Sequence, residues 1–413
     1  MSETTQTVAE HAADELRRRG LGAAAATTVR DLRVRLASGE LGAVPVILGL
    51  ALIWTYFEVQ DQHFLTARNL SNLVLQISVT GTIAVGVVLV LLLGEIDLSV
   101  GSVAGATAAV LGVLVVDKSW PWWAGIIAML LVGAAIGAFQ GAWFAMLGVP
   151  SFVVTLAGLL GWLGVQLHVL GSAGTLNVFD SHITAIASTF LSDSWGWVLA
   201  VAATVAYAGS RLLEDARRRR AGMRARPLIV VVTQTIVTAA ICLGVVAVLN
   251  HASGVPTAGV VLVGLVVVFD WLTRRTKFGR YIYAVGGNAE AARRAGIGVT
   301  RIRIYVFALA GTLSAIGGLI STGRLQAAST QTGGGTLLLE AIAAAVIGGT
   351  SLFGGRGNAW SALLGALVIG SVSNGLDLIG QPADVKYMVE GAILLLAVTI
   401  DALSRRRLAA SGR

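Results

Sequence analysis

Long apolar runs, separated by short polar segments, follow one another from Leu41 to Leu403. A helix that crosses a membrane needs about 20 predominantly apolar residues, so this pattern predicts an all-α polytopic membrane protein with about 12 (10–12) transmembrane segments. The predicted segments are 41–57, 72–93, 98–116, 121–147, 151–170, 195–209, 228–249, 256–271, 304–321, 336–353, 359–379 and 385–402. Several short glycine-rich runs are compatible with broken or re-entrant helices as well as with full spans.

The positions of lysine and arginine predict the orientation of the chain. Of the 30 basic residues, 26 lie in 1–40, 211–226, 272–303 and 405–413 or at Arg356. The loops on the other side hold Arg68, Lys118, Arg324 and Lys386. Cytoplasmic loops carry the excess of Lys and Arg, so we expect both termini in the cytoplasm and an even number of crossings.

The same distribution predicts how the chain is divided. We expect a cytoplasmic N-terminal tail over 1–40, one transmembrane domain over 41–403 and a cytoplasmic C-terminal tail over 404–413. The two large cytoplasmic loops are 211–226, which is rich in arginine, and 272–303.

Composition narrows the class of protein. The 413 residues are 55% hydrophobic and only 13% charged, whereas soluble domains carry about 25% charged residues. The net charge of +8 comes from basic residues that cluster in the loops between apolar segments. It therefore does not indicate a nucleic-acid partner. One cysteine, Cys242, and five scattered histidines leave no intrachain disulfide and no close-spaced metal-ligand set. We therefore expect no metal and no cofactor bound by this chain.

A first polar motif stands between two apolar runs, at Gly94–Gly101. Acidic groups at such a junction are costly unless they face water, protein partners or a helix end. Asp97 or Ser99 is placed to cap the following helix, and Glu95 is placed to be favoured by its dipole. A capped break between two helices is therefore one interpretation, and a polar lining for a solute path or a partner contact is the other.

A second motif lies in the basic loop 272–303. Asn288 is a good N-cap, Glu290 lies in the first turn, Arg293 and Arg294 lie in the last, and Gly296 is placed to end the helix. These signals predict a short capped helix over 288–295. A solvated connector is the simpler reading, whereas the two caps and the preceding glycine pair favour a rigid docking element.

A third motif begins at Glu340 and leads through small residues into a glycine-rich break at Gly348–Gly357. The chain contains no GxxxxGK[ST] sequence, so the glycines do not form a P-loop. A backbone turn that needs the dihedral freedom of glycine is the alternative. Asn374 and Asp377 add polar groups near the outer end of a span, with Glu390 facing them across a short loop, and either a path role or hydrogen bonds between helices accounts for them.

Together these motifs resemble the permeases of bacterial ABC importers for monosaccharides, the ribose, arabinose and xylose group. The matching stretches are GEIDLSVGS (94–102), GVPSFVVTLAG (148–158), YAVGGNAEAARRAGI (283–297) and EAIAAAVIGGTSLFGGRG (340–357). The resemblance covers roughly 41–403. The combination of these four stretches is specific for the family, whereas any one of them alone is a weak match. The stretch 195–271, with two spans around the arginine-rich loop, is most similar to the longer xylose-type permeases, so D-xylose is the expected sugar.

This resemblance implies a multi-pass permease of the bacterial plasma membrane, the inner membrane of the cell, and not an enzyme. The expected partners are a second permease copy in a homodimer, two cytoplasmic ABC ATPase domains that hold ATP and Mg, and an extracytoplasmic sugar-binding protein. Residues carried over to the coupling helix on the ATPase are Gly286, Gly287, Asn288, Glu290, Ala291, Ala292, Arg293 and Gly296. Residues expected to line the path or gate are Glu95, Asp97, Ser99, Glu340, Gly348, Gly349, Ser351, Asn374 and Asp377.

Two other classes are open to test. An ion-coupled secondary transporter of a small polar solute would work without partners and would use intramembrane carboxylates such as Asp97, Asp377 and Glu390. An intramembrane enzyme is disfavoured, because the chain has neither a GxSxG nor an HExxH motif.

Overall fold

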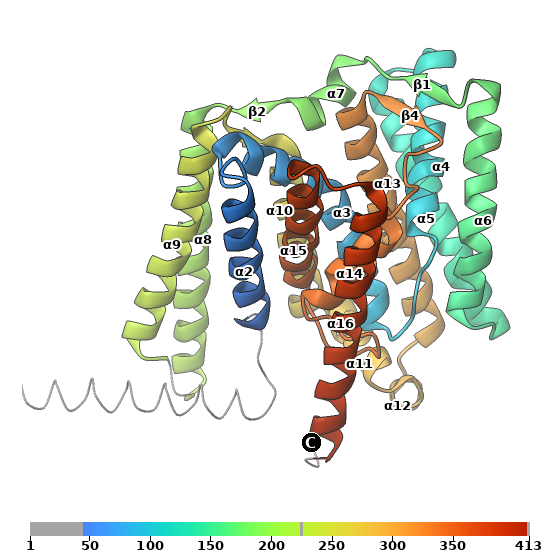
Figure 1. The fold of residues 1–413 in the computed structure, drawn as a ribbon. Helices are drawn as coiled ribbons and strands as arrows, with labels where there is room; N and C mark the ends of the chain where they lie inside the picture. Colours follow the sequence, from blue (N-terminus) through green and yellow to red (C-terminus); the bar gives the residue numbers. More distant parts are fainter. Residues whose placement is uncertain (1–43, 224–225, 411–413) are drawn as a thin grey trace, which may run out of the picture.

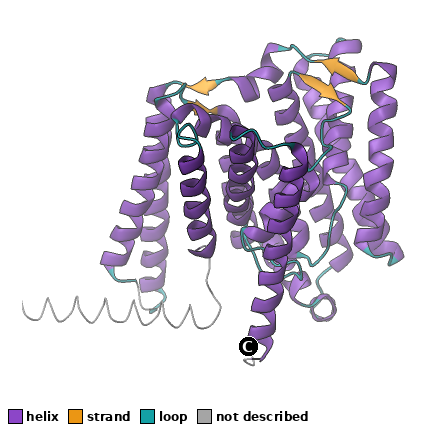
Figure 2. Cartoon of the chain, in the orientation of Figure 1, coloured by secondary structure: helices purple, strands orange, loops and turns teal. Residues whose placement is uncertain are grey.

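The computed structural model describes residues 44–223 and 226–410, so the predicted tail 1–40 lies outside the described residues. Within them the chain is helical almost throughout, and short strands occur only at one end of the bundle (Figure 2). The helices are α2 (Val44–Gln60), α3 (Ala67–Leu92), α4 (Val100–Gly112), α5 (Trp122–Leu147), α6 (Ser151–Leu170), α7 (Ser181–Ser188), α8 (Asp193–Arg220), α9 (Leu228–Asn250), α10 (Thr257–Arg275), α11 (Lys277–Gly287), α12 (Ala289–Arg294), α13 (Val299–Leu325), α14 (Leu337–Ile347), α15 (Ala359–Leu378) and α16 (Ala383–Ala410). This confirms the all-α class predicted from the apolar runs.

Each predicted apolar run coincides with a helix. Nine of the described helical segments are long and apolar enough to cross a membrane, and two more apolar helices, α2 and α14, are shorter. Of the two readings left open for glycine-rich runs, the structure shows the broken helix over 336–353, because α14 has only 11 residues, or about 16 Å at 1.5 Å per residue. The chain reaches α14 through a non-helical segment after α13 (Figure 1), so this region is a half-helix with an extended lead.

Local sequence signals explain where several helices begin and end. Proline immediately precedes α5, α6, α9 and α10, as expected for a residue whose fixed φ suits a helix start. Gly148 ends α5 in the left-handed conformation, with φ 73°. Asn358 caps α15 by accepting a hydrogen bond from Trp360 N.

Helix α3 is the central element of the fold. Every residue from Ile77 to Leu92 is buried, because α10, α13, α14 and α15 all pack against it.

Small residues allow close packing between α5 and α13. A Cβ at Gly133 of α5 would lie 2.6 Å from the Gly311 carbonyl oxygen of α13. The missing side chain at this glycine therefore lets α5 and α13 approach closely.

Helices α8 and α9 form a hairpin at the edge of the bundle (Figure 1). They pack mainly against each other, and most of their side chains are exposed. Since these exposed side chains are largely apolar along both helices, the hairpin has the composition expected of a lipid-facing element.

The two ends of the bundle differ in character. One end holds α7 and two small antiparallel sheets, which pair β1 (Thr175–Asn177) with β4 (Ala327–Ser329) and β2 (Phe190–Leu191) with β3 (Val255–Pro256). The opposite end holds α11, α12, the α8–α9 connection, the start of α2 and the end of α16 (Figure 1). The basic loops are thus gathered at one end of the bundle. Helix α16 also extends to Ala410, so it includes part of the predicted C-terminal tail.

Candidate functional site

The first break, residues 93–99, joins α3 to α4 and is buried around Asp97. The Asp97 Oδ1 atom accepts hydrogen bonds from Ser99 N at 2.8 Å and Ser99 Oγ at 2.6 Å. Ser99 Oγ in turn accepts from Gln140 Nε2 at 3.0 Å, and Thr155 Oγ1 donates to the Ile96 carbonyl. The polar groups of this break are therefore bonded to one another and to α5 and α6.

The predicted capping of α4 by Asp97 or Ser99 is wrong. Ser99 is the N-cap, but no side chain accepts from the first turn of α4, because Asp97 is engaged by Ser99 itself. Glu95 pairs with Arg303 of α13 at 2.7 Å. The carboxylates of this motif thus tie the break to its neighbours.

The second break, residues 348–358, joins α14 to α15 and depends on glycine. Positive φ angles occur at Gly349 (102°), Gly354 (86°), Gly355 (71°) and Gly357 (138°), a region that only glycine enters readily. The predicted glycine-dependent turn is confirmed. Gly348 has ordinary helical φ but lies against the Ser361 backbone, and the buried Ser351 donates its N–H to the Arg356 carbonyl.

The predicted short helix in the basic loop is α12. Asn288 Oδ1 accepts from Ala291 N at 2.9 Å, and Gly296 has φ 83°, as the caps predicted. Glu290 forms exposed ion pairs with Arg293 at 3.3 Å and Arg294 at 3.2 Å. Ala292 is buried, so α12 has one face on the bundle while its charges face outward.

Helix α11 packs against the end of α3 and against the second break at a contact we call the glycine junction, which is made of Leu92, Gly94, Gly286, Gly354 and Gly355. Gly355 N donates to the Leu92 carbonyl at 3.0 Å. A Cβ at Gly286 would overlap the Leu92 carbonyl oxygen, and one at Gly354 would lie 2.7 Å from the Gly286 carbonyl oxygen. Three segments far apart in sequence thus meet backbone to backbone.

Tyr283 adds a side-chain link from α11 to the second break. Its hydroxyl donates to the Gly357 carbonyl at 2.8 Å. Burial raises the pKa of this phenol above its ordinary value, so the hydroxyl stays protonated and remains a hydrogen-bond donor.

The polar groups of α15 are bonded to neighbouring helices. Asn374 is buried, and its Oδ1 accepts from Asn69 Nδ2 of α3 at 2.8 Å. Asp377 forms an ion pair with Lys386 at the start of α16. These contacts match the interpretation of hydrogen bonding between helices.

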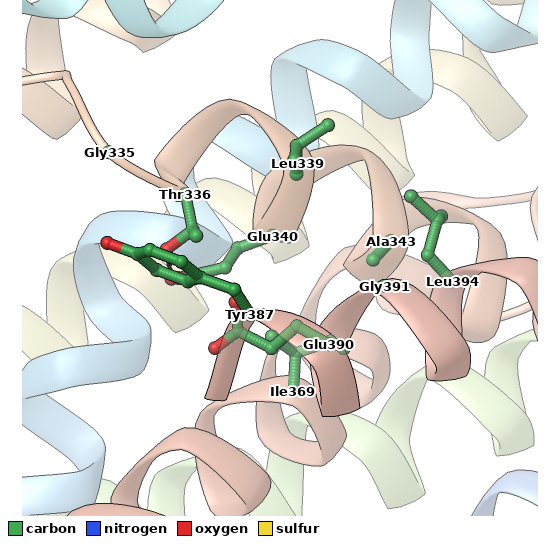
Figure 3. A pocket seen from close by; sticks show the side chains of 10 residues that line it. All are labelled: Gly335, Thr336, Leu339, Glu340, Ala343, Ile369, Tyr387, Glu390, Gly391 and Leu394. Carbon is green, nitrogen blue, oxygen red and sulfur yellow. Dashed lines mark hydrogen bonds between the residues drawn. The ribbon is translucent and has the colours of Figure 1, made fainter. Parts of the chain in front are cut away.

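A cavity of about 360 Å³ lies between α14, α15 and α16. Figure 3 shows the Thr336 hydroxyl and the Glu340 and Glu390 carboxylates gathered beside the Tyr387 ring. At the other end of the cavity lie Leu339, Ala343 and Leu394, all apolar. Of the residues predicted to line a path, Glu340 is the one that lines this cavity.

The structure therefore separates the predicted path residues into three places. Glu95, Asp97 and Ser99 lie in the first break, and Gly348, Gly349 and Ser351 lie in the second. Glu340 lies at the cavity, and Asn374 and Asp377 lie beyond it on α15.

Sequence reasoning missed several partners of these groups, namely Thr80, Tyr283, Arg303, Thr336 and Tyr387. Only Thr336, one helical turn before Glu340, leaves a signal in the local sequence.

Comparison with known proteins identifies the class. Residues 69–398 match the family model described as the permease component of branched-chain amino acid transport systems. The chain belongs to this family, and it is a multi-pass membrane permease.

Individual relatives are permeases of sugar transport systems. The chain is 40% identical to the xylose transport system permease protein of Escherichia coli K12, over 88% of this chain and 92% of that protein. It is 37% identical to the protein of the same name from Haemophilus influenzae, over 91% and 100%. It is 33% identical to the ribose import permease protein of Escherichia coli K12, over 86% and 92%. No solved structure matches the chain.

Proposed function

We propose that this chain is the permease subunit of an ATP-binding-cassette importer that carries a monosaccharide, D-xylose, across a bacterial plasma membrane. The support for the sugar is the 40% identity to a xylose permease, against 33% to a ribose permease. The proposed complex is a homodimer of permeases with both termini cytoplasmic, two cytoplasmic ATPase domains that bind ATP and Mg, and an extracytoplasmic sugar-binding protein. The chain itself holds no P-loop, so a partner must supply the energy.

The observation that carries the proposal is the glycine junction. Helix α12 follows Gly286 by only a few residues and presents its charged residues at the end of the bundle where the basic loops gather. The backbone of α11 contacts the second break directly and contacts Leu92, the residue of α3 that precedes the first break. A displacement of α12 is therefore transmitted to the segments that join α3 to α4 and α14 to α15. In this mechanism closure of the ATPase domains moves α12, and the breaks convert that movement into opening of the path on one side or the other.

The coupling assignment is tested by exchanging charges on α12, with Glu290→Arg combined with Arg293→Glu. The exchange keeps an opposite-charge pair at i,i+3 and involves exposed side chains, so folding is retained. The outward charge pattern is reversed, and copurification of the ATPase and xylose uptake fall by about tenfold or more. Normal copurification and uptake would refute the assignment.

A matched control exchanges two exposed charges at the opposite end of the bundle, with Asp117→Lys combined with Lys118→Asp. Net charge is again unchanged, and copurification of the ATPase and uptake stay at wild-type levels.

A further inference from the structure

The end of α8 carries more positive charge than the nearby carboxylates neutralise. Between positions 211 and 226 the sequence holds seven arginines and two carboxylates, Glu214 and Asp215. Glu214 forms ion pairs at 3.2–3.7 Å with three of the arginines, which are Arg211, Arg218 and Arg226. Within the described residues, three arginines in the last turn of α8 form no ion pair, namely Arg217, Arg219 and Arg220. This end of the hairpin therefore keeps an excess of positive charge.

A groove of about 220 Å³ lies beside these arginines, between the end of α8 and the start of α9. It is lined by the basic residues Arg219 and Arg226, the acidic residue Asp215 and the apolar residues Leu212, Leu228 and Val231. Asp215 is buried, whereas both arginines are partly exposed. The charge that this groove presents to its surroundings is thus positive, and its remaining wall is apolar.

The groove opens toward the side of the bundle that has the composition of a lipid-facing surface. Leu212 and Leu228, which line it, are 54% and 66% exposed. Their neighbours Leu213 and Ile229 are also largely exposed. Apolar side chains beside interfacial arginines are typical of a helix end at the level of the lipid headgroups.

The chemistry of the groove favours a ligand with a phosphate and an apolar tail. A guanidinium binds phosphate through paired hydrogen bonds, and an apolar wall favours contact with an acyl chain. A free phosphate would leave the apolar wall unused. Clusters of arginine beside a membrane-spanning helix attract anionic lipids. A protein partner is less favoured, because the charged helix α12 lies away from the hairpin at the same end of the bundle (Figure 1).

We propose that this groove is a binding site for an anionic phospholipid. Arg219 and Arg226 hold the phosphate, and one acyl chain lies along Leu212 and Leu228. The site anchors the hairpin to the leaflet at the basic end of the bundle. This inference depends neither on the sugar nor on the ATPase partner, so it stands or falls separately from the proposed function.

Binding of phosphatidylglycerol to the full chain in detergent, measured by native mass spectrometry, tests the phosphate contact. The wild-type chain is expected to bind it more tightly than phosphatidylcholine with the same acyl chains. Arg219→Gln removes an unpaired cation from the lining and should weaken binding about tenfold, as expected for a lost hydrogen bond to a charged group. Arg219→Lys keeps the charge but loses the paired geometry, so its loss should be smaller.

Arg217→Gln is the matched control for the phosphate contact. It removes the same charge from the same helical turn, also without breaking an ion pair, but Arg217 lies outside the groove lining. Its affinity should stay within about twofold of wild type, since one exposed charge contributes little by itself. Equal losses in Arg217→Gln and Arg219→Gln would show a general attraction between charges and would overturn the site.

A second pair of variants tests the acyl chain. Leu228→Ala removes part of the apolar wall and should weaken phosphatidylglycerol binding by about threefold. Ile229→Ala, at an exposed position next to it but outside the lining, should leave binding unchanged. Displacement of the lipid by an equal concentration of inorganic phosphate would show that the groove takes free phosphate, and would overturn the proposal.

The remaining outcomes separate a lipid from a protein partner. Each variant is expected to unfold at the wild-type temperature and to copurify with the ATPase as wild type does. Unchanged phosphatidylglycerol binding in Arg219→Gln would overturn the inference, and a loss of ATPase copurification in the same variant would assign the groove to a protein partner. An importer that carries no sugar would overturn the proposed function and leave the lipid site standing.

Discussion

The glycine junction leaves no room between its backbones, whereas the cavity between α14, α15 and α16 has a volume of about 360 Å³. At the junction a Cβ on Gly286 would overlap Leu92, and the nearby carboxylates Asp97 and Glu95 are both bonded. At the cavity, Glu390 Oε2 has no partner in the described residues. The difference concerns packing: a tightly packed contact can transmit a movement, whereas a region with free volume can adjust to a change in one side chain.

The largest expected effect comes from adding one methyl group at the junction. Gly286→Ala forces Leu92 and the second break apart and is expected to cost about 3 kcal/mol of unfolding free energy, with loss of folded protein on expression. The measurement is thermal unfolding of the detergent-solubilised chain.

Gly287→Ala is its matched control, because a Cβ at Gly287 meets no atom within 4 Å. This variant should unfold within about 0.5 kcal/mol of wild type. Equal stability of the two variants would show that the junction is not tightly packed.

A smaller loss is expected from the buried carboxylate of the first break. Asp97→Ala leaves the Ser99 N–H and hydroxyl without their acceptor and should cost about 2 kcal/mol. Asp97→Asn keeps an acceptor oxygen at the same place and should cost less. If both substitutions were neutral in the same unfolding assay, the bonded network around Asp97 would not contribute to stability.

The smallest expected effect on stability is at the cavity. Glu390→Gln removes a charge from an incompletely bonded site, so its unfolding free energy should stay within about 1 kcal/mol of wild type or rise. A destabilisation as large as that of Asp97→Ala would mean that Glu390 holds the fold together. The comparison between the two regions would then fail.

The fold could be predicted where a signal is local in the sequence. Apolar runs gave the helices, and Asn288 and Gly296 gave the ends of α12, because capping depends on a few neighbouring residues. The length of α14 was missed, since its apolar run continues into glycines whose positive φ angles end the helix early.

The site was less predictable, because its contacts join residues far apart in the chain. Thr80 and Glu340 are 260 residues apart, and no local pattern reports such a pair. The capping role expected of Asp97 was wrong because its carboxylate accepts a hydrogen bond from the Ser99 hydroxyl in the buried break. A local hydrogen bond of this kind competes with capping of the helix.

The most direct test of the account is xylose uptake into vesicles that contain this chain and its ATPase partner, with the sugar-binding protein outside. The account predicts uptake that requires ATP on the cytoplasmic side, requires the binding protein, and persists when proton and sodium gradients are collapsed. Uptake by this chain alone, driven by an ion gradient without ATP, would contradict it and would establish an ion-coupled carrier instead.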